Sequence, residues 1–313
     1  MNPRRGLTAG VIVALAVSIA AALGACGGGG EDAEAAPWEY AEPMSQRRSY
    51  VAATELRGDI YAAGGMVGET GRRLATFQRY DPKANAWETL SRMPEAIRAA
   101  TGAAVGGTFY VVGGDAEEGD GTQVYAYAVA AGKWEPRAPL QAPRFNHSAV
   151  ALGGKVYVLG GYIAGEERAE VFVYDPEANA WSEATPLPDP VHAFDAVVFR
   201  DEIWVIGGRQ GERILRSVWI YEPAEGRWRD GPALPKPMEL LGAANVEDEE
   251  IHAVWESTYQ IYDADSGTWR QGPRSLTTRH GLNTFYVDGA LFTVGGCTTQ
   301  LRDSQIVETR RIA

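Results

Sequence analysis

The sequence predicts an all-β fold built from one repeated unit, and two periodic features point to it. Double glycines recur along the chain: the first four are separated by 49, 47 and 47 residues, and the fifth follows after 88, about two periods. Five tyrosines, each seven residues before a tryptophan, recur in the same phase. A fixed period of this length marks a repeat architecture in which each unit packs on its neighbours.

Both sets of periodic residues are expected to belong to the scaffold, because they recur in nearly every unit. The double glycines are Gly64-Gly65, Gly113-Gly114, Gly160-Gly161, Gly207-Gly208 and Gly295-Gly296. The aromatic pairs are Tyr80 and Trp87, Tyr127 and Trp134, Tyr174 and Trp181, Tyr221 and Trp228, and Tyr262 and Trp269. We expect the aromatic rings to pack between units.

Four strands are predicted in each unit, as the third unit illustrates. Its residues 147–152, 155–161, 170–175 and 180–184 form short runs rich in valine and tyrosine, which favour strands. Gly153-Gly154 and Asp175-Pro176 separate these runs and favour turns. The double glycine ends the second strand, where the backbone must turn sharply beside its neighbours, and glycine allows positive φ without a side chain.

The strand-ending double glycine and the tyrosine–tryptophan pair resemble the kelch repeat, and the resemblance covers residues 38 to 313. It implies a six-bladed β-propeller of four-stranded blades. The missing sixth double glycine would fall at Ala253-Val254. Trp38 has no preceding tyrosine, whereas the last unit lacks a tryptophan and has Thr309 at the expected tyrosine position. We therefore expect the strand near Trp38 to be the outermost strand of the sixth blade, which closes the ring.

The N-terminal segment has the pattern of an export signal. Arg4 and Arg5 precede an apolar run over residues 7–23. The run ends in Leu23-Gly24-Ala25-Cys26, which resembles the lipobox of bacterial lipoproteins and implies that Cys26 is lipidated. The sequence thus divides into a signal peptide over 1–25, a lipidated cysteine and flexible tether over 26–36, and the propeller over 37–313. An uncleaved anchor helix is the alternative. Both place the propeller on the periplasmic or extracellular side of a bacterial cell envelope.

Composition excludes several function classes. A net charge of −12 argues against nucleic-acid binding. Two cysteines exclude a disulfide-rich scaffold and a zinc ribbon. The histidines lack metal-ligand spacing, and nucleotide-binding and nucleophile-elbow motifs are absent from the sequence, so we expect no metal and no cofactor. The histidines are His147, His192, His252 and His280. A monomeric propeller is expected.

The resemblance places ligands on the face where the loops between blades meet the loops after each second strand. The first loop set holds candidate ligand-binding residues 15 to 16 positions before the double glycines: Arg48, Arg98, Arg144, His192 and Arg279. Such a basic ring would hold an acidic ligand through bidentate guanidinium contacts. The alternative is that these arginines belong to the repeat and pair with nearby carboxylates or carbonyls.

The second loop set differs from blade to blade, as ligand contacts should. It comprises Met66, Asp115, Tyr162, Arg209, Trp255 and Cys297, of which Tyr162, Arg209 and Trp255 are the favoured candidates. The alternative for Trp255 is that it fills the space left by the missing glycines.

Two functions remain open at this point. The first is an envelope-anchored binding module for a glycan, an acidic small ligand or a protein, whether as a receptor or as a structural member of an envelope complex. The second is a sugar-processing enzyme similar to the kelch-type sialic acid mutarotases, in which funnel arginines hold the sugar carboxylate and Glu239 or a histidine moves a proton. Copper chemistry of the galactose oxidase type is not expected, because no tyrosine–histidine copper site can be assembled from the sequence.

Overall fold

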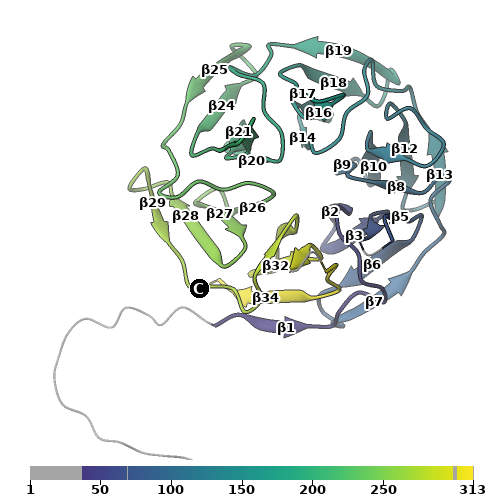
Figure 1. The fold of residues 1–313 in the computed structure, drawn as a ribbon, viewed down its shortest axis with the longest axis horizontal. Helices are drawn as coiled ribbons and strands as arrows, with labels where there is room; N and C mark the ends of the chain where they lie inside the picture. The colour runs from purple at the N-terminus through teal and green to yellow at the C-terminus, as the bar shows by residue number, and fades with distance from the viewer. Residues whose placement is uncertain (1–36, 69, 299–301, 313) are drawn as a thin grey trace, which may run out of the picture. The chain divides into compact units, whose positions relative to one another are not determined.

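The computed structural model describes residues 37–68, 70–298 and 302–312, so the predicted signal peptide, Cys26 and the tether lie outside the described residues. The regular structure in this part of the chain consists of strands. It contains no helix long and apolar enough to span a membrane. Figure 1 shows the strands arranged as a ring of blades around a central axis. The all-β prediction is confirmed.

Six antiparallel sheets of four strands form the blades in the described residues, as the repeat count predicts. From the axis outward, blade one contains β2 (Ala52–Leu56), β3 (Asp59–Ala63), β6 (Phe77–Asp81) and β7 (Ala86–Thr89). Blade two contains β9 (Thr101–Val105), β10 (Thr108–Val112), β12 (Val124–Ala128) and β13 (Lys133–Pro136). Blade three contains β14 (Ser148–Leu152), β15 (Lys155–Leu159), β18 (Val171–Asp175) and β19 (Ala180–Ala184).

The second half of the ring follows the same order. Blade four contains β20 (Asp195–Phe199), β21 (Glu202–Ile206), β24 (Val218–Glu222) and β25 (Arg227–Asp230). Blade five contains β26 (Gly242–Val246), β27 (Glu250–Trp255), β28 (Thr258–Asp263) and β29 (Thr268–Gln271). Blade six contains β31 (Asn283–Val287), β32 (Ala290–Val294), β34 (Val307–Arg311) and β1 (Glu39–Ala41).

Short two-stranded ribbons lie at one end of the blades. They are β4 (Met66–Val67) with β5 (Arg72–Arg73), β8 (Ile97–Arg98) with β11 (Asp115–Ala116), β16 (Tyr162–Ile163) with β17 (Glu166–Glu167), β22 (Arg209–Gln210) with β23 (Arg213–Ile214), and β30 (Arg279–His280) with β33 (Cys297–Thr298). Each ribbon includes the segment that directly follows a double glycine.

The two ends of the described chain meet in blade six. Strand β1 pairs antiparallel with β34, so that Tyr40 lies opposite Glu308. Blade six therefore takes its outermost strand from the N-terminal side and its other three from the C-terminal side, as predicted. Figure 1 shows β1 alongside β34 at the rim of the ring. This pairing closes the ring without leaving a free blade edge between the two chain ends.

The core lies between neighbouring blades, where the repeated aromatic residues pack. Each tyrosine pairs across strands with its tryptophan, and the ring centroids of Tyr174 and Trp181 lie 5.0 Å apart. Tyr127 of blade two packs into one cluster with Phe77 of blade one. The Trp181 indole also donates a 2.8 Å hydrogen bond to the carbonyl of Ala138, which lies 43 residues earlier in the preceding link. These residues therefore fasten each blade to the one before it, as predicted.

The double glycines allow a close approach that a side chain would block. Gly64 and Gly65 have φ of +67° and +94°. A Cβ at Gly64 would lie 2.4 Å from the carbonyl oxygen of Ile97, which precedes blade two. The Gly65 amide donates to that same carbonyl at 2.8 Å. In blade five Ile251 lies opposite Tyr262 as Ile60 lies opposite Tyr80, so the double-glycine positions are Trp255 and Glu256, and the predicted Ala253-Val254 is wrong by two residues. The Glu256 amide donates to the carbonyl of Arg279, as the Gly65 amide does to that of Ile97.

One predicted position in blade six is wrong by one residue. In blade one Ile60 lies opposite Tyr80, and in blade six Leu291 occupies the position of Ile60, four residues before the double glycine. Leu291 lies opposite Arg310. Arg310, and not Thr309, therefore stands where the other blades have tyrosine.

Candidate functional site

The loops that lead into the blades and the segments after the double glycines lie side by side on one face, here called the loop face. His192 forms an antiparallel bridge with Arg209, and Phe145 forms one with Tyr162. In blade two Arg98 lies opposite Asp115. The expectation that the two loop sets share a face is confirmed.

The predicted basic positions fall into two classes that differ by one residue. Arg48, Arg144 and Arg279 stand sixteen residues before their double glycines, whereas Arg98 and His192 stand fifteen before theirs. Neighbouring residues in an extended chain point in opposite directions. The first class points into the blade and the second lies on the loop face. The six residues of the second class are Ser49, Arg98, Phe145, His192, Glu239 and His280, and they differ from blade to blade. Glu239 belongs to this class by its contacts, because Met238 before it accepts from the Gly208 amide as Ile97 before Arg98 accepts from the Gly65 amide.

The three arginines of the first class are parts of the scaffold. Arg48, Arg144 and Arg279 are 0%, 1% and 0% exposed. Arg48 donates to the carbonyls of Gly64 and Thr76, both at 3.0 Å. Burial lowers the pKa of Arg48 and Arg144 to about 10, which leaves both protonated at neutral pH.

Arg144 and Arg279 use their guanidinium groups in the same way. Arg144 donates to the carbonyl of Gly160 at 2.9 Å, and Arg279 to that of Gly295 at 2.7 Å. Each guanidinium thus satisfies carbonyls where the second strand breaks at the double glycine. The prediction that these three arginines form a ligand-binding ring is corrected. They serve the repeat, which was the alternative reading.

Arg98 and Arg209 do lie on the loop face, but each is held in an ion pair. Arg98 donates to Asp115 at 2.7 Å, and Arg73 reaches the other oxygen of that carboxylate at 2.6 Å. Burial opposes ionisation of Asp115, but the two arginines outweigh it and lower the pKa of the carboxyl. Arg209 donates hydrogen bonds to both carboxylate oxygens of Glu239. The predicted positive ring is therefore neutralised within the described part of the face.

The same pairing weakens the enzyme hypothesis. Glu239 accepts from Arg209 through both carboxylate oxygens, so it is not free to act as a base in this arrangement. Among the histidines, His147 and His252 are buried. Within the described residues, no group of three or more histidine, cysteine, aspartate and glutamate side chains could hold a metal ion.

Trp255 is half-buried and packs against the apolar cluster between blades four and five. This packing fits the space-filling alternative, and the predicted ligand contact of Trp255 stays a prediction. Cys297 is also buried, and burial raises the pKa of its thiol.

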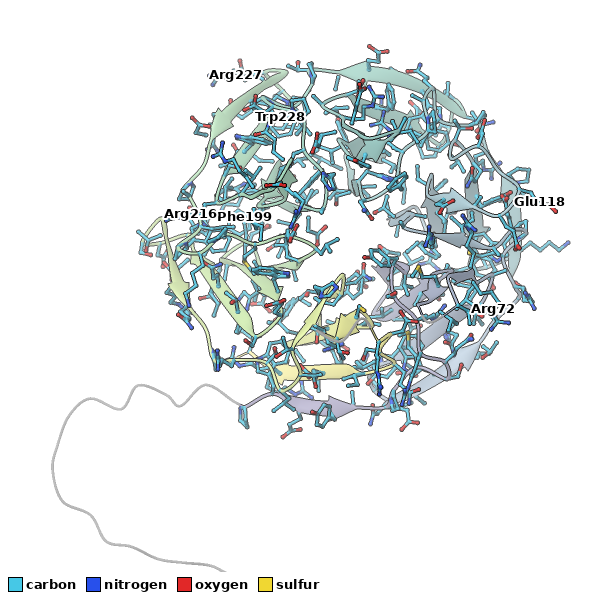
Figure 2. All side chains as sticks on the ribbon, viewed as in Figure 1. Arg72, Glu118, Phe199, Arg216, Arg227 and Trp228 are labelled. Atoms are coloured by element: carbon cyan, nitrogen blue, oxygen red, sulfur yellow. The ribbon has the colours of Figure 1, made fainter. Side chains whose placement is uncertain are left out.

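Tyr162 belongs to a run of three rings on the loop face. Its ring centroid lies 5.7 Å from that of Phe145 and 4.8 Å from that of His192. Burial lowers the pKa of His192, with Glu167 opposing that effect. All three side chains are half-buried, so their edges face solvent. Figure 2, which draws all side chains on the ring, shows how densely they fill the blades around the central axis.

A pocket of about 250 Å³ opens beside this aromatic run. Its walls are Tyr50, Met66, Arg98, Ala99, Asp115, Phe145 and Asn146. The pocket therefore combines two aromatic rings and a thioether with the Arg98–Asp115 ion pair. Tyr50 and Asn146 have φ of 54° and 50°, and the Asn146 amide donates to the carbonyl of Ala99 in the preceding loop at 3.3 Å.

Sequence reasoning missed Tyr50, Phe145 and Asn146. The signal for Phe145 was its place fifteen residues before a double glycine, which separates the loop-face residues from the buried arginines. Tyr50 and Asn146 stand two residues after a buried arginine, and the equivalent residues also vary among blades.

Comparison with known proteins agrees with the geometry of the ring. A family model described as the KLHDC2/KLHL20/DRC7 Kelch-repeats domain matches residues 50–249. The chain belongs to the kelch-repeat family. Kelch-like protein 35 of Mus musculus is 36% identical over 85 residues, which cover 27% of this chain and 14% of the mouse protein.

Other kelch relatives match stretches of similar length. Kelch-like protein 23 of Homo sapiens is 36% identical over 67 residues, 21% of this chain and 12% of the human protein. An F-box/kelch-repeat protein of Arabidopsis thaliana is 38% identical over 72 residues, 23% of this chain and 17% of the plant protein. The chain thus matches less than a fifth of the length of these relatives. Kelch propellers commonly serve as protein-interaction modules.

Proposed function

We propose that this kelch propeller binds a protein partner through its loop face, with the pocket between Tyr50 and Phe145 as the anchor point. The observation that carries the proposal is the contrast between the two classes of loop residue. The arginines that recur are buried in the blades, whereas the residues that reach the loop face differ from blade to blade. Because the repeat does not fix the residues of this surface, they can be complementary to one particular partner.

The chemistry of the loop face favours a protein over an acidic sugar. Phe145, Tyr162 and Tyr50 offer aromatic surface, and aromatic residues with Met and Arg are enriched at protein interfaces. Arg98 and Arg209 already have carboxylate partners, so an acidic sugar would have to displace Asp115 or Glu239. An apolar side chain of a partner can enter the pocket without breaking either ion pair.

We also propose that Cys26 anchors the propeller to the cell envelope through a lipid. The support comes from the sequence, where small residues precede Cys26 and a glycine-rich segment follows it. The partner would then be a protein that is exposed on the same side of the membrane.

The proposal is tested by co-purification from native membranes. The full-length wild type, Phe145→Asp and Tyr40→Asp would be expressed at equal levels and purified in mild detergent. Tyr40 is 63% exposed on the outer strand of blade six, so it provides a matched aromatic control away from the loop face. We expect one partner to be retained by wild type and Tyr40→Asp and lost from Phe145→Asp. Equal recovery with all three proteins would contradict the proposal, as would selective binding of a glycan and no protein.

A further inference from the structure

The interface between blades five and six is polar where the other interfaces are aromatic. His252 occupies the middle of the second strand, where the other blades have Tyr61, Tyr110, Tyr157, Trp204 and Phe292. Arg310 occupies the tyrosine position of blade six. Both side chains are buried, at 1% and 5% exposure.

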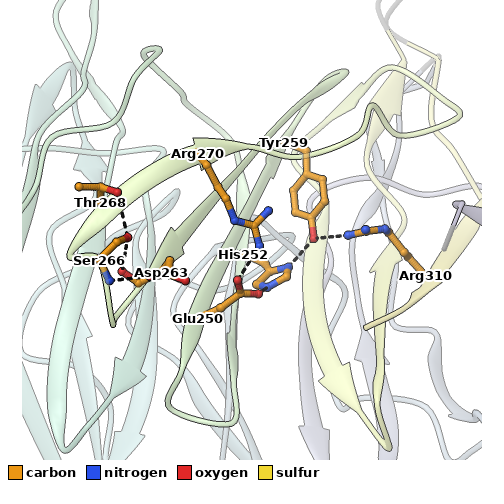
Figure 3. A network of polar contacts seen from close by, with 8 residues as sticks. All are labelled: Glu250, His252, Tyr259, Asp263, Ser266, Thr268, Arg270 and Arg310. Carbon is orange, nitrogen blue, oxygen red and sulfur yellow. Dashed lines mark hydrogen bonds and ion pairs between the residues drawn. The ribbon is translucent and has the colours of Figure 1, made fainter. Parts of the chain in front are cut away.

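A directional chain of hydrogen bonds joins the two blades through these residues, as Figure 3 shows. Arg310 of blade six donates from Nη1 to the Tyr259 hydroxyl of blade five at 3.0 Å. The Tyr259 hydroxyl lies in hydrogen-bond contact with Nδ1 of His252. Nε2 of His252 lies 2.7 Å from Glu250, whose other carboxylate oxygen accepts from Arg270.

Neutral His252 gives every donor and acceptor of this chain one partner. Arg310 can only donate, so the Tyr259 hydroxyl accepts from it and gives its own proton to Nδ1. Nε2 then carries the proton that faces Glu250. A protonated imidazole would carry a second proton on Nδ1, which would point at the same hydroxyl as Arg310. The hydroxyl would have to turn away, and two cations would share one oxygen atom.

The groups around His252 come from several strands. Glu250 faces it from its own strand, Tyr259 from β28, Arg270 from β29 and Arg310 from β34, while its partner on β26 is Ala244. Burial is the main cause that lowers the pKa of His252, and Arg270 and Arg310 act in the same direction against the opposing effect of Glu250.

Solvent can reach these groups from one side. A cavity of about 460 Å³ lies between blades five and six, and its walls include Glu250, His252, Arg270 and Arg310. Water in a polar cavity of this size can deliver a proton to the ring.

We propose that Glu250, His252, Tyr259 and Arg310 form an acid-sensitive latch, which holds blade five to blade six at neutral pH and loosens when His252 is protonated. The latch lies next to the blade that closes the ring, since Trp38 of that blade packs edge-on against Tyr259 with ring centroids 5.6 Å apart. Acidification would thus loosen the propeller at the junction that joins its two chain ends.

Hydrogen exchange of the full-length protein at pH 7.5 and pH 5.0, corrected for intrinsic rates, tests the latch. When the interface between blades five and six opens, the His252 imidazole can titrate near its usual pKa of about 6.5. The equilibrium constant for opening should therefore be up to about thirtyfold larger at pH 5.0 than at pH 7.5. We expect this loss of protection in β28 and β34. Blade-one strands β3 and β6, in a blade without histidine, report on any global change.

Three variants separate the latch from a purely structural role. His252→Asn keeps an acceptor near Nδ1 that cannot titrate, so β28 and β34 should stay protected at pH 5.0. Tyr259→Phe removes the link, so exchange should be fast at both pH values. Tyr174→Phe is the matched control, because its hydroxyl bonds Asn179 in blade three, and it should behave as wild type.

The latch is wrong if wild-type β28 and β34 keep their protection at pH 5.0, or if β3 and β6 lose as much. It is also wrong if His252→Asn stays acid-sensitive. If either His252→Asn or Tyr259→Phe fails to fold, the other variant decides. Exchange of β28 and β34 that does not depend on pH supports the latch, whereas acid-dependent exchange like that of wild type overturns it.

Discussion

Trp38 donates its indole N–H to the carbonyl of Pro273 at 3.3 Å, although 235 residues separate them in the chain. The same bond joins Trp134 to Ser91 and Trp181 to Ala138 over 43 residues. The N-terminal tryptophan of the propeller therefore makes at the closing blade the contact that its counterparts make between consecutive blades. Ring closure is thus another copy of the repeat interaction, supplied by the opposite end of the chain.

Replacing Trp38 should weaken the ring as a whole. Trp38→Phe loses the bond to Pro273 and part of the contact with Tyr259, so we expect the free energy of unfolding to fall by about 1–3 kcal/mol. Urea unfolding followed by circular dichroism measures it. Tyr40→Ala, two residues away and exposed, should change the free energy by less than about 0.5 kcal/mol. Equal effects of the two substitutions would refute the role of Trp38 in closure.

The buried arginines and the loop-face arginines should respond differently to substitution. Arg144→Ala removes the guanidinium that donates to the carbonyls of Gly160 and Glu170 and packs 4.3 Å from the Phe172 ring centroid. We expect it to lower the free energy of unfolding by about 2–4 kcal/mol. Arg209→Ala breaks a partly exposed ion pair and should cost about 1 kcal/mol or less. Chemical denaturation distinguishes the two, and a larger loss for Arg209→Ala would contradict the assignment.

His147 should make the propeller sensitive to acid. Burial lowers its pKa to about 3. The folded protein then binds fewer protons than the unfolded chain between about pH 6.5 and pH 3, so stability falls as the pH drops through this window. His147 alone should cost about 2–3 kcal/mol between pH 7.5 and pH 4.5.

The difference between wild type and His147→Gln isolates this contribution. Asp195 acts in the opposite sense, because burial raises its pKa to about 6, which favours the folded state as the pH falls from 6 towards 4. Asp195 is common to both proteins and cancels in the comparison. We expect the variant to lose less stability than wild type on acidification to pH 4.5. Parallel pH profiles would show that His147 does not titrate as its burial requires.

The proposed lipid anchor predicts a change in mass and location. Cys26→Ala removes the only thiol that the lipobox pattern offers, so the variant should lack the mass of the lipid and leave the membrane fraction. Intact-mass spectrometry and fractionation measure both, with Cys297→Ala as the control that should stay membrane-bound. A Cys26→Ala protein that remains in membranes with unchanged mass would rule out the anchor.

The features of the fold that repeat could be predicted from the sequence. Gly64-Gly65 and Trp87 have counterparts in other blades, so their spacing revealed the blades and the closing role of Trp38. The missing glycines of blade five were placed two residues too early, at Ala253-Val254, whereas the strand register puts these positions at Trp255-Glu256. The predictions of loop residues were wrong where a shift of one residue reverses the direction in which a side chain points. A window of 15 to 16 residues combined Arg48, which is buried, with Arg98, which reaches the loop face.

The candidate site was harder to predict because its residues do not repeat. Tyr50, Phe145 and Asn146 come together only when neighbouring blades are placed in the ring, and their spacing in sequence carries no sign of this. Likewise, the partners of Arg209 and Arg98 depend on contacts between separate loops. The buried chain from Arg310 to His252 joins positions that hold aromatic residues in other blades, so only the packed interface reveals it.

Site-directed photocrosslinking in living cells tests the central claim, that the loop face binds a protein. A photoreactive phenylalanine analogue would replace Phe145 or Tyr162 on the loop face, and Tyr40 or Trp87 on the outer strands. We predict crosslinks to one common protein from positions 145 and 162, and none to that protein from positions 40 and 87. Crosslinks from the outer strands alone, or the same product from all four positions, would contradict the account.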